Sequence, residues 1–163
     1  MKQGHPGPPE RRKPKVAVVI GSGGLKCAAA LGVPKVLQRE GTGIDMAIGC
    51  SGGSFFATAI ALGAADMDEA AERFARGWSG IFGRVAYRTM LSVLFPRLFG
   101  FGHRFGLLDD EKVNQGIESF TRQLTFADTE IPLHLAATDY RTGEKVVLSH
   151  GKLADAIRAS IAI

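Results

Sequence analysis

Apolar and polar positions in the first third of the chain switch between strand-like and helix-like patterns. Residues 16–20 form a continuous apolar, β-branched run, a pattern typical of a parallel strand buried on both faces, and residues 45–48 are expected to form a second short buried strand. Each leads through a glycine-rich turn into a helical pattern, over 25–40 and 51–62. Pro34 lies inside the first helix and predicts a kink or a restart. Since crossover connections are right-handed, both strands should be parallel and adjacent.

The rest of the chain continues this alternation of strands and helices. Helical patterns are expected at 66–76, 108–124 and from 153 onward, and strands at 133–137 and 145–148, joined by a turn. An irregular segment between the first two of these helices holds five of the ten phenylalanines. The order of elements predicts an α/β fold with a mostly parallel central sheet.

The net positive charge of the chain is concentrated at the N-terminus. The chain of 163 residues carries a net charge of +4, and five basic residues against one acidic residue in segment 1–15 account for all of it. Residues 16–163 are therefore neutral, which gives no support to a nucleic-acid-binding face. With four prolines, segment 1–15 is expected to be a disordered basic leader, with attraction to phosphate or anionic lipid as an alternative. It has no apolar secretory core.

The cysteines and the apolar stretches exclude several classes of protein. Cys27 and Cys50 belong to no C-x-x-C pair, so neither a disulfide scaffold nor a metal site is expected. A reducing compartment, the cytoplasm, is the expected location. The longest strongly apolar stretch, 55–65, is too short for a membrane-spanning helix, which needs about 20 residues.

A candidate nucleophile lies in the motif Gly49-Cys-Ser-Gly-Gly53, between a predicted strand and a predicted helix. This context is typical of a nucleophile elbow, which would hold Ser51 in a strained backbone conformation with its hydroxyl exposed. Side chains at Gly49 and Gly53 would collide, and Gly52 would allow close approach of a substrate. The alternative is a plain glycine turn with an incidental serine.

A second glycine-rich turn, Gly21-Ser-Gly-Gly24, precedes the first predicted helix. Its free backbone N–H groups could hold a phosphate or a developing oxyanion. A dinucleotide fingerprint requires glycine where Lys26 stands, and a Walker loop requires serine or threonine where Cys27 stands. The oxyanion interpretation is favoured because the neighbouring strand supplies Ser51. A nucleotide-binding βαβ domain stays as an alternative.

Together these elements resemble the patatin-like phospholipase family, whose members show G-G-G-G-x-[KR]-G followed by I-D-x-I-x-G-T-S-x-G. The counterparts are Gly21-Ser-Gly-Gly-Leu-Lys-Cys27 and Ile44-Asp-Met-Ala-Ile-Gly-Cys-Ser-Gly-Gly53. Further matches are Gly106-Leu-Leu-Asp109, Ile131-Pro-Leu133, Ala137-Thr-Asp139, Thr142-Gly-Glu144 and the segment 153–162. The resemblance covers residues 16–163, interpreted as the N-terminal part of a patatin-like domain.

The resemblance implies a three-layer α/β/α fold and a serine lipid acyl hydrolase of the phospholipase or esterase type. Ser51 would be the nucleophile, and Gly23, Gly24 and Gly52 are candidates for the oxyanion hole. Lys26 stands where the family has a basic residue beside that hole. The implied substrate is a phospholipid or another acyl ester, and no metal or organic cofactor is implied.

Departures from the family pattern concern the loop and the catalytic base. Ser22 and Cys27 replace family glycines and add a Cβ near the loop, which could reshape it. The family uses an aspartate in a D-G-[GA] motif, and these 163 residues contain no Asp-Gly pair. The apolar end of the chain indicates truncation before that motif, so little ester turnover is expected from this chain alone. A catalytically inactive, lipid-binding pseudoenzyme is the alternative.

Two further interpretations stay open. Asp139 followed by His150 formally satisfies the acid-then-histidine order of α/β-hydrolases, although shaping the turn to Arg141 is the simpler role for Asp139. The aromatic segment 80–105 could form an acyl groove or an interfacial lid that touches a membrane surface, with Arg84, Arg88 and Arg97 facing lipid head groups. Completion of the core by its phenylalanines is the alternative.

Overall fold

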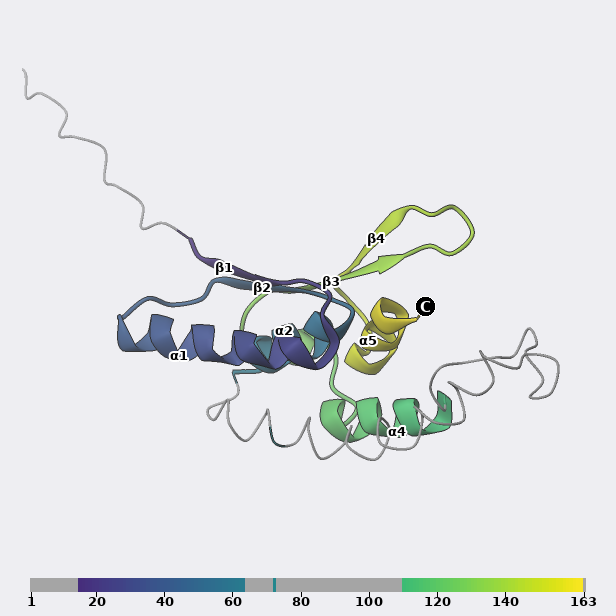
Figure 1. The fold of residues 1–163 in the computed structure, drawn as a ribbon, viewed down its shortest axis with the longest axis horizontal. Coiled ribbons are helices and arrows are strands. Elements are labelled where there is room, and N and C mark those ends of the chain that lie inside the picture. The colour runs from purple at the N-terminus through teal and green to yellow at the C-terminus, as the bar shows by residue number, and fades with distance from the viewer. Residues whose placement is uncertain (1–14, 64–71, 73–109, 163) are drawn as a thin grey trace, which may run out of the picture.

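The computed structural model describes residues 15–63, 72 and 110–162 (Figure 1). Residues 1–14 of the leader, most of the helix expected at 66–76 and the aromatic segment 80–105 lie outside the described residues. The elements in chain order are β1 (Ala17–Ile20), the 3₁₀ helix η1 (Gly24–Leu31), α1 (Gly32–Arg39), β2 (Met46–Cys50), α2 (Gly52–Ala61), α4 (Asp110–Thr121), the 3₁₀ helix η2 (Phe126–Asp128), β3 (Leu133–Thr138), β4 (Lys145–Leu148) and α5 (Leu153–Ile161).

The strands form one four-stranded sheet in the order β1-β2-β3-β4. β1 pairs with β2 and β2 with β3 in parallel, whereas β3 and β4 form an antiparallel hairpin. The predicted mostly parallel α/β arrangement is confirmed, as is the adjacency of the first two strands. The carboxyl ends of β1 and β2 therefore meet at one edge of the sheet, where both glycine-rich turns follow.

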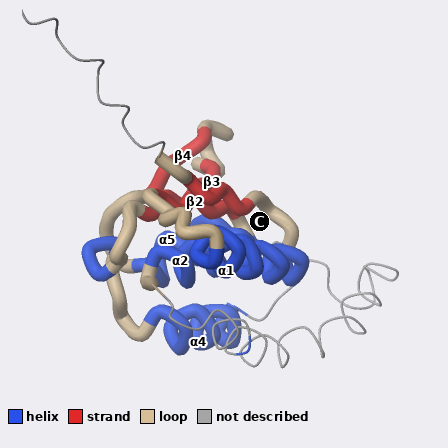
Figure 2. Tube along the Cα trace, turned by 90° about the vertical axis from the view of Figure 1, so that its left-hand side faces the viewer, coloured by secondary structure: helices blue, strands red, loops and turns tan. Residues whose placement is uncertain are grey.

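The described helices cover one face of this sheet (Figures 1 and 2). α2 contacts β1, β2 and β3 and lies between η1 and α5, and α4 packs against α5 on the side that faces away from the sheet. Every residue of α2 is buried, and the hydroxyls of its two polar residues, Ser54 and Thr58, donate to the backbone carbonyls of Ser51 and Ser54. Phe55 of α2 meets Phe120 of α4 edge-on, with ring centroids 5.8 Å apart.

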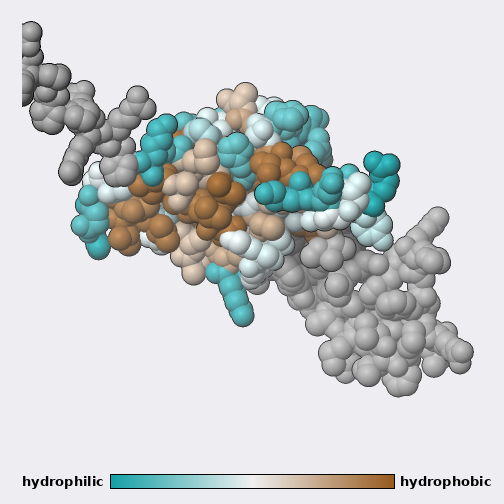
Figure 3. All heavy atoms as spheres, turned by 90° about the horizontal axis from the view of Figure 1, so that it is seen from above, coloured by the Kyte–Doolittle hydropathy of each residue, from teal (hydrophilic) through white to brown (hydrophobic). Residues whose placement is uncertain are grey.

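The other face of the sheet departs from the expectation that β1 is buried on both sides. Val18 and Ile20 lie in the core, whereas Val19 between them is 67% exposed. Val147 of β4 is 52% exposed, and Figure 3 shows hydrophobic side chains on this side. An apolar run is compatible with two covered faces, but the described helices cover only one. The described residues thus supply the sheet and one helical layer, and the second layer stays a prediction.

Helix ends follow the local signals in the sequence. The predicted restart near Pro34 is confirmed, because η1 ends at Leu31 and α1 begins at Gly32. Pro34 thus lies in the first turn of α1, where its missing N–H costs no hydrogen bond. Gly41 and Gly63 follow α1 and α2 with φ of 68° and 63°, in the left-handed region that glycine adopts without strain.

A short connection before β3 is held by a capping box. The Thr125 hydroxyl accepts from the Ala127 amide, while Asp128 accepts from the Thr125 amide and hydroxyl. These hydrogen bonds stabilise the ionised carboxylate and hold the pKa of Asp128 below its ordinary value. This box is a structural feature and belongs to no candidate site.

Candidate active site

Ser51 alone joins β2 to α2, so the chain reverses direction over one residue. Its φ of 52° and ψ of −127° lie in a region that residues other than glycine rarely adopt. Holding a residue there costs on the order of 1–3 kcal/mol, which the surrounding packing must supply. Ser51 occupies the N-cap position of α2, yet its side chain makes no capping hydrogen bond. Ser51 is half-buried as a residue, and its hydroxyl takes no part in the helix cap.

Close packing explains the glycines on either side of Ser51. A Cβ added to Gly49 would lie 2.6 Å from the Cα of Ser54, and one added to Gly53 would overlap the carbonyl oxygens of Ile20 and Gly21. Contacts this short require movement of the backbone. Any side chain at either position would therefore push α2 away from the strands.

Gly52 brings the two glycine-rich turns into direct contact. A Cβ on Gly52 would lie 2.7 Å from both the Cα and the backbone nitrogen of Gly24. The register of the parallel strands, which pairs Ile20 with Gly49, places the turns side by side. The structure therefore brings together Ser51, Gly52 and Gly24, with Gly23 next to Gly24 in the chain.

The first glycine turn leaves backbone donors at the start of η1. Lys26 donates its amide to the Gly23 carbonyl over 3.2 Å, while the amides that precede it have no acceptor within the helix. Lys26 is exposed beside this turn, and Gly23 and Gly24 are exposed as well. In general, backbone amides at the start of a helix can bind an anionic group.

Cys27 occupies the space below this turn. Its buried Sγ donates to the Gly21 carbonyl over 3.3 Å. A Cβ on Gly23 would lie 3.1 Å from that sulfur, so the thiol packs against the underside of the loop. The extra side chain is accommodated towards the core, away from the exposed surface of the turn.

Two further serines, Ser54 and Ser160, bind the backbone of Ser51, and no role was predicted for either from the sequence. Ser54 donates both its amide (2.9 Å) and its hydroxyl (2.6 Å) to the Ser51 carbonyl. The Ser51 amide donates to the Oγ of Ser160 over 2.8 Å. One feature of the sequence could have indicated Ser160. It follows the buried Leu153 and Ile157 at helical spacing, which places a serine on an apolar face of the helix.

The alternative pairing of Asp139 with His150 is wrong. Asp139 Oδ1 accepts from the amides of Arg141 (2.8 Å) and Thr142 (3.2 Å), and so shapes the β3–β4 turn. The hairpin register pairs Leu135 with Leu148. Continuing it puts His150 opposite the start of β3, whereas Asp139 follows the end of β3. The two residues lie at opposite ends of the hairpin and form no Asp–His pair.

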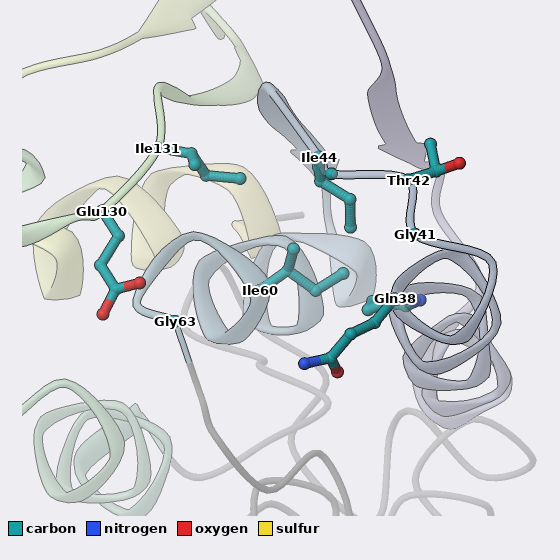
Figure 4. Close-up of a pocket in the computed structure, with 10 residues that line it drawn as sticks. Gln38, Gly41, Thr42, Ile44, Ile60, Gly63, Glu130 and Ile131 are labelled. Atoms are coloured by element: carbon teal, nitrogen blue, oxygen red, sulfur yellow. The ribbon is translucent and has the colours of Figure 1, made fainter.

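A pocket of about 430 Å³ lies at the other edge of the sheet (Figure 4). Ile44 and Ile131, which precede β2 and β3, line it together with Glu130 and with Gly63 after α2. Ser51 follows the carboxyl end of β2 and precedes α2, so it lies at the opposite ends of both elements. The pocket is therefore separate from the glycine-rich turns.

Comparison with known proteins shows which family this chain belongs to. The family model for patatin-like phospholipase matches residues 18–163. The chain belongs to the patatin-like phospholipase family. Uncharacterized NTE family proteins of Mycobacterium bovis and Mycobacterium tuberculosis are 32% identical to this patatin-like chain over 151 residues. The alignment covers 92% of this chain and 38% of each relative, so the chain spans less than half of the length of these relatives.

The described part of this patatin-like domain contains no candidate for a bilayer-spanning helix. None of its helices is both long enough and apolar enough to cross a membrane. Within the same residues, no group of three or more histidine, cysteine or acidic side chains is arranged to hold a metal ion.

Proposed function

We propose that this patatin-like chain carries the nucleophile and the oxyanion loop of a serine lipid acyl hydrolase. The observation that carries the proposal is the contact between Gly52 and Gly24 directly beside Ser51, whose hydroxyl takes no part in the helix cap. The substrate class that follows from the family is a phospholipid or another acyl ester. We also propose that the substrate is met at a membrane surface, through peripheral contact.

In the proposed reaction, Ser51 Oγ attacks the ester carbonyl carbon and its proton passes to a base. The carbonyl oxygen becomes an oxyanion, for which the amides of Gly23, Gly24 and Gly52 are the proposed donors. Loss of one such donor typically lowers turnover by about 10²–10³-fold. Collapse breaks the bond to the alcohol, which takes the proton. Water then attacks the acyl-enzyme, releasing the fatty acid and restoring the Ser51 hydroxyl.

The base and the charge beside the loop complete the proposal. These 163 residues contain no Asp-Gly pair, so we assign the base to an aspartate in the remainder of the full-length protein. Lys26, exposed at the start of η1, adds positive charge beside the proposed donors. Its side chain would favour a negatively charged transition state or a phosphate head group.

A fluorophosphonate probe applied to the full-length protein tests the proposal, because it reacts with activated serines. We expect labelling that is lost in Ser51→Ala and kept in Ser119→Ala, which removes an exposed hydroxyl from α4. Absence of labelling in the folded protein, together with lipid binding, would favour a pseudoenzyme. Stabilisation by nucleotides in a thermal-shift assay would instead favour a nucleotide-binding domain.

A further inference from the structure

We propose that Ser160 of α5 is a positioning residue that holds the backbone of Ser51 in its strained conformation. The inference rests on the proposed function of Ser51. The Ser160 hydroxyl accepts from the Ser51 amide over 2.8 Å and donates to the Ala136 carbonyl of β3 over 2.7 Å. One side chain thus links α5, β3 and the turn between β2 and α2, across 109 positions of sequence.

The β2–β3 ladder explains why a hydroxyl is needed at this point. The Ala47 amide donates to the Pro132 carbonyl, and the parallel register continues with Cys50 opposite Ala136. The same two-residue spacing would bring the Ser51 amide to the Ala136 carbonyl. The Ser160 hydroxyl lies between these two groups and bonds to both. It therefore replaces the next bond of the ladder where Ser51 turns away from the strand.

The directions of these hydrogen bonds fix the roles of the two serines. An amide can only donate and a carbonyl can only accept, so the Ser160 hydroxyl must accept from Ser51 and donate to Ala136. Ser160 is 8% exposed and uses its only hydrogen, which makes it a poor nucleophile. The Ser51 amide is also occupied, so a developing oxyanion must be served by other amides. Gly52 and the neighbouring glycine turn supply these.

Ser54 also holds the backbone of Ser51, and together with Ser160 it forms what we call the Ser51 clamp. It binds the Ser51 carbonyl through two donors, whereas Ser160 is the acceptor of the Ser51 amide. Loss of the Ser160 hydroxyl would leave a partly buried amide without this acceptor and the Ala136 carbonyl without this donor. The backbone of Ser51 would then be free to relax, carrying Oγ away from its position beside Gly24.

Steady-state kinetics of the full-length protein on a soluble acyl ester test this role. We expect Ser160→Ala to lower kcat by about 10–100-fold, because small displacements of a nucleophile have effects of this size. KM should stay within about two-fold, since binding of the substrate is not altered. Ser160→Thr, which keeps the hydroxyl, should recover most of the lost kcat.

Thr121→Val provides the matched control. It also deletes a fully buried hydroxyl that donates to a backbone carbonyl, that of Ile117 in α4. This variant should lose stability but keep the wild-type kcat. Equal kcat values in folded Ser160→Ala and Thr121→Val would overturn the proposal. If Ser160→Ala does not fold, Ser160→Cys takes its place, because a thiol donates and accepts hydrogen bonds more weakly than a hydroxyl. A lower kcat supports the role, and an unchanged kcat overturns it.

Amide hydrogen exchange separates this inference from the proposed function. Exchange of the Ser51 amide should accelerate in Ser160→Ala, or in Ser160→Cys where alanine does not fold, and not in Thr121→Val, whether or not the protein hydrolyses esters. Absence of Ser51-dependent turnover in the wild type would refute the proposed function and leave this readout intact. Unchanged exchange at Ser51 would refute the clamp itself.

Discussion

The two glycine-rich turns lie against each other, yet different physical requirements shape them. In the turn 49–53, Cβ atoms added to Gly49, Gly52 or Gly53 would overlap neighbouring backbone. In the turn 21–24, an added Cβ at Gly21 or Gly24 would meet nothing within 4 Å. Close packing therefore requires glycine at these positions of the turn 49–53. At Gly24, glycine is favoured because the backbone adopts a φ of 55°.

This difference indicates that the two turns of the candidate site are held in place in different ways. The turn that presents Ser51 is enclosed by β1, α2 and α5, so its geometry is determined by many atoms at once. The turn 21–24 is exposed along its whole length and depends on local backbone conformation. Replacing a glycine should consequently have a severe effect in the enclosed turn, and in the exposed turn the effect should depend on the position.

The largest effect is expected from Gly53→Ala. The new Cβ would overlap the carbonyl oxygens of Ile20 and Gly21, so α2 must move away from β1. We expect the free energy of unfolding to fall by about 3 kcal/mol or more, as for overpacked cores, together with loss of probe labelling. Urea denaturation measures the first effect. A loss below about 1 kcal/mol would show that the turn is not tightly enclosed.

An intermediate effect is expected from Gly24→Ala. Space is available for the methyl group, but a φ of 55° costs a residue with a Cβ about 1–2 kcal/mol. Urea denaturation should show a loss in this range. Gly24→Asn should lose less, because asparagine tolerates left-handed conformations better. Equal losses in both variants would indicate that space, and not the backbone angle, limits this position.

Ser51→Gly should raise stability while it abolishes labelling. Glycine adopts positive φ without strain, so about 1 kcal/mol of backbone strain is expected to be released on replacing Ser51. The comparison is made by thermal and urea unfolding against Ser51→Ala, which removes the hydroxyl and keeps the Cβ. A glycine variant no more stable than the alanine variant would contradict stored strain in this turn.

The smallest effect is expected from Gly21→Ala. Nothing lies within 4 Å of the added Cβ, and φ at Gly21 is not in the left-handed region. Stability should change by no more than about 0.5 kcal/mol, as at other open surface positions. Urea denaturation of this variant also calibrates the Gly24 series. A loss as large as that of Gly53→Ala would remove the contrast between the two turns.

Local patterns allowed much of this fold to be predicted from the sequence. The strand–turn–helix order, the restart near Pro34 and the helix ends at Gly41 and Gly63 all follow from properties of neighbouring residues. Parallel pairing of β1 with β2 also followed, because a short helical crossover allows few topologies. Membership of the patatin-like family was likewise predictable, since it rests on motifs contained in short segments.

Tertiary structure alone decided which residues meet at the site. The bond between Ser51 and Ser160 joins residues 109 positions apart, and no local pattern encodes such a pairing. The exposure of Val19 depends on which helices cover the sheet, and the separation of Asp139 from His150 depends on the hairpin register. Periodicity reports how a residue relates to its chain neighbours. Partners across the fold are determined only when strands pair and helices pack.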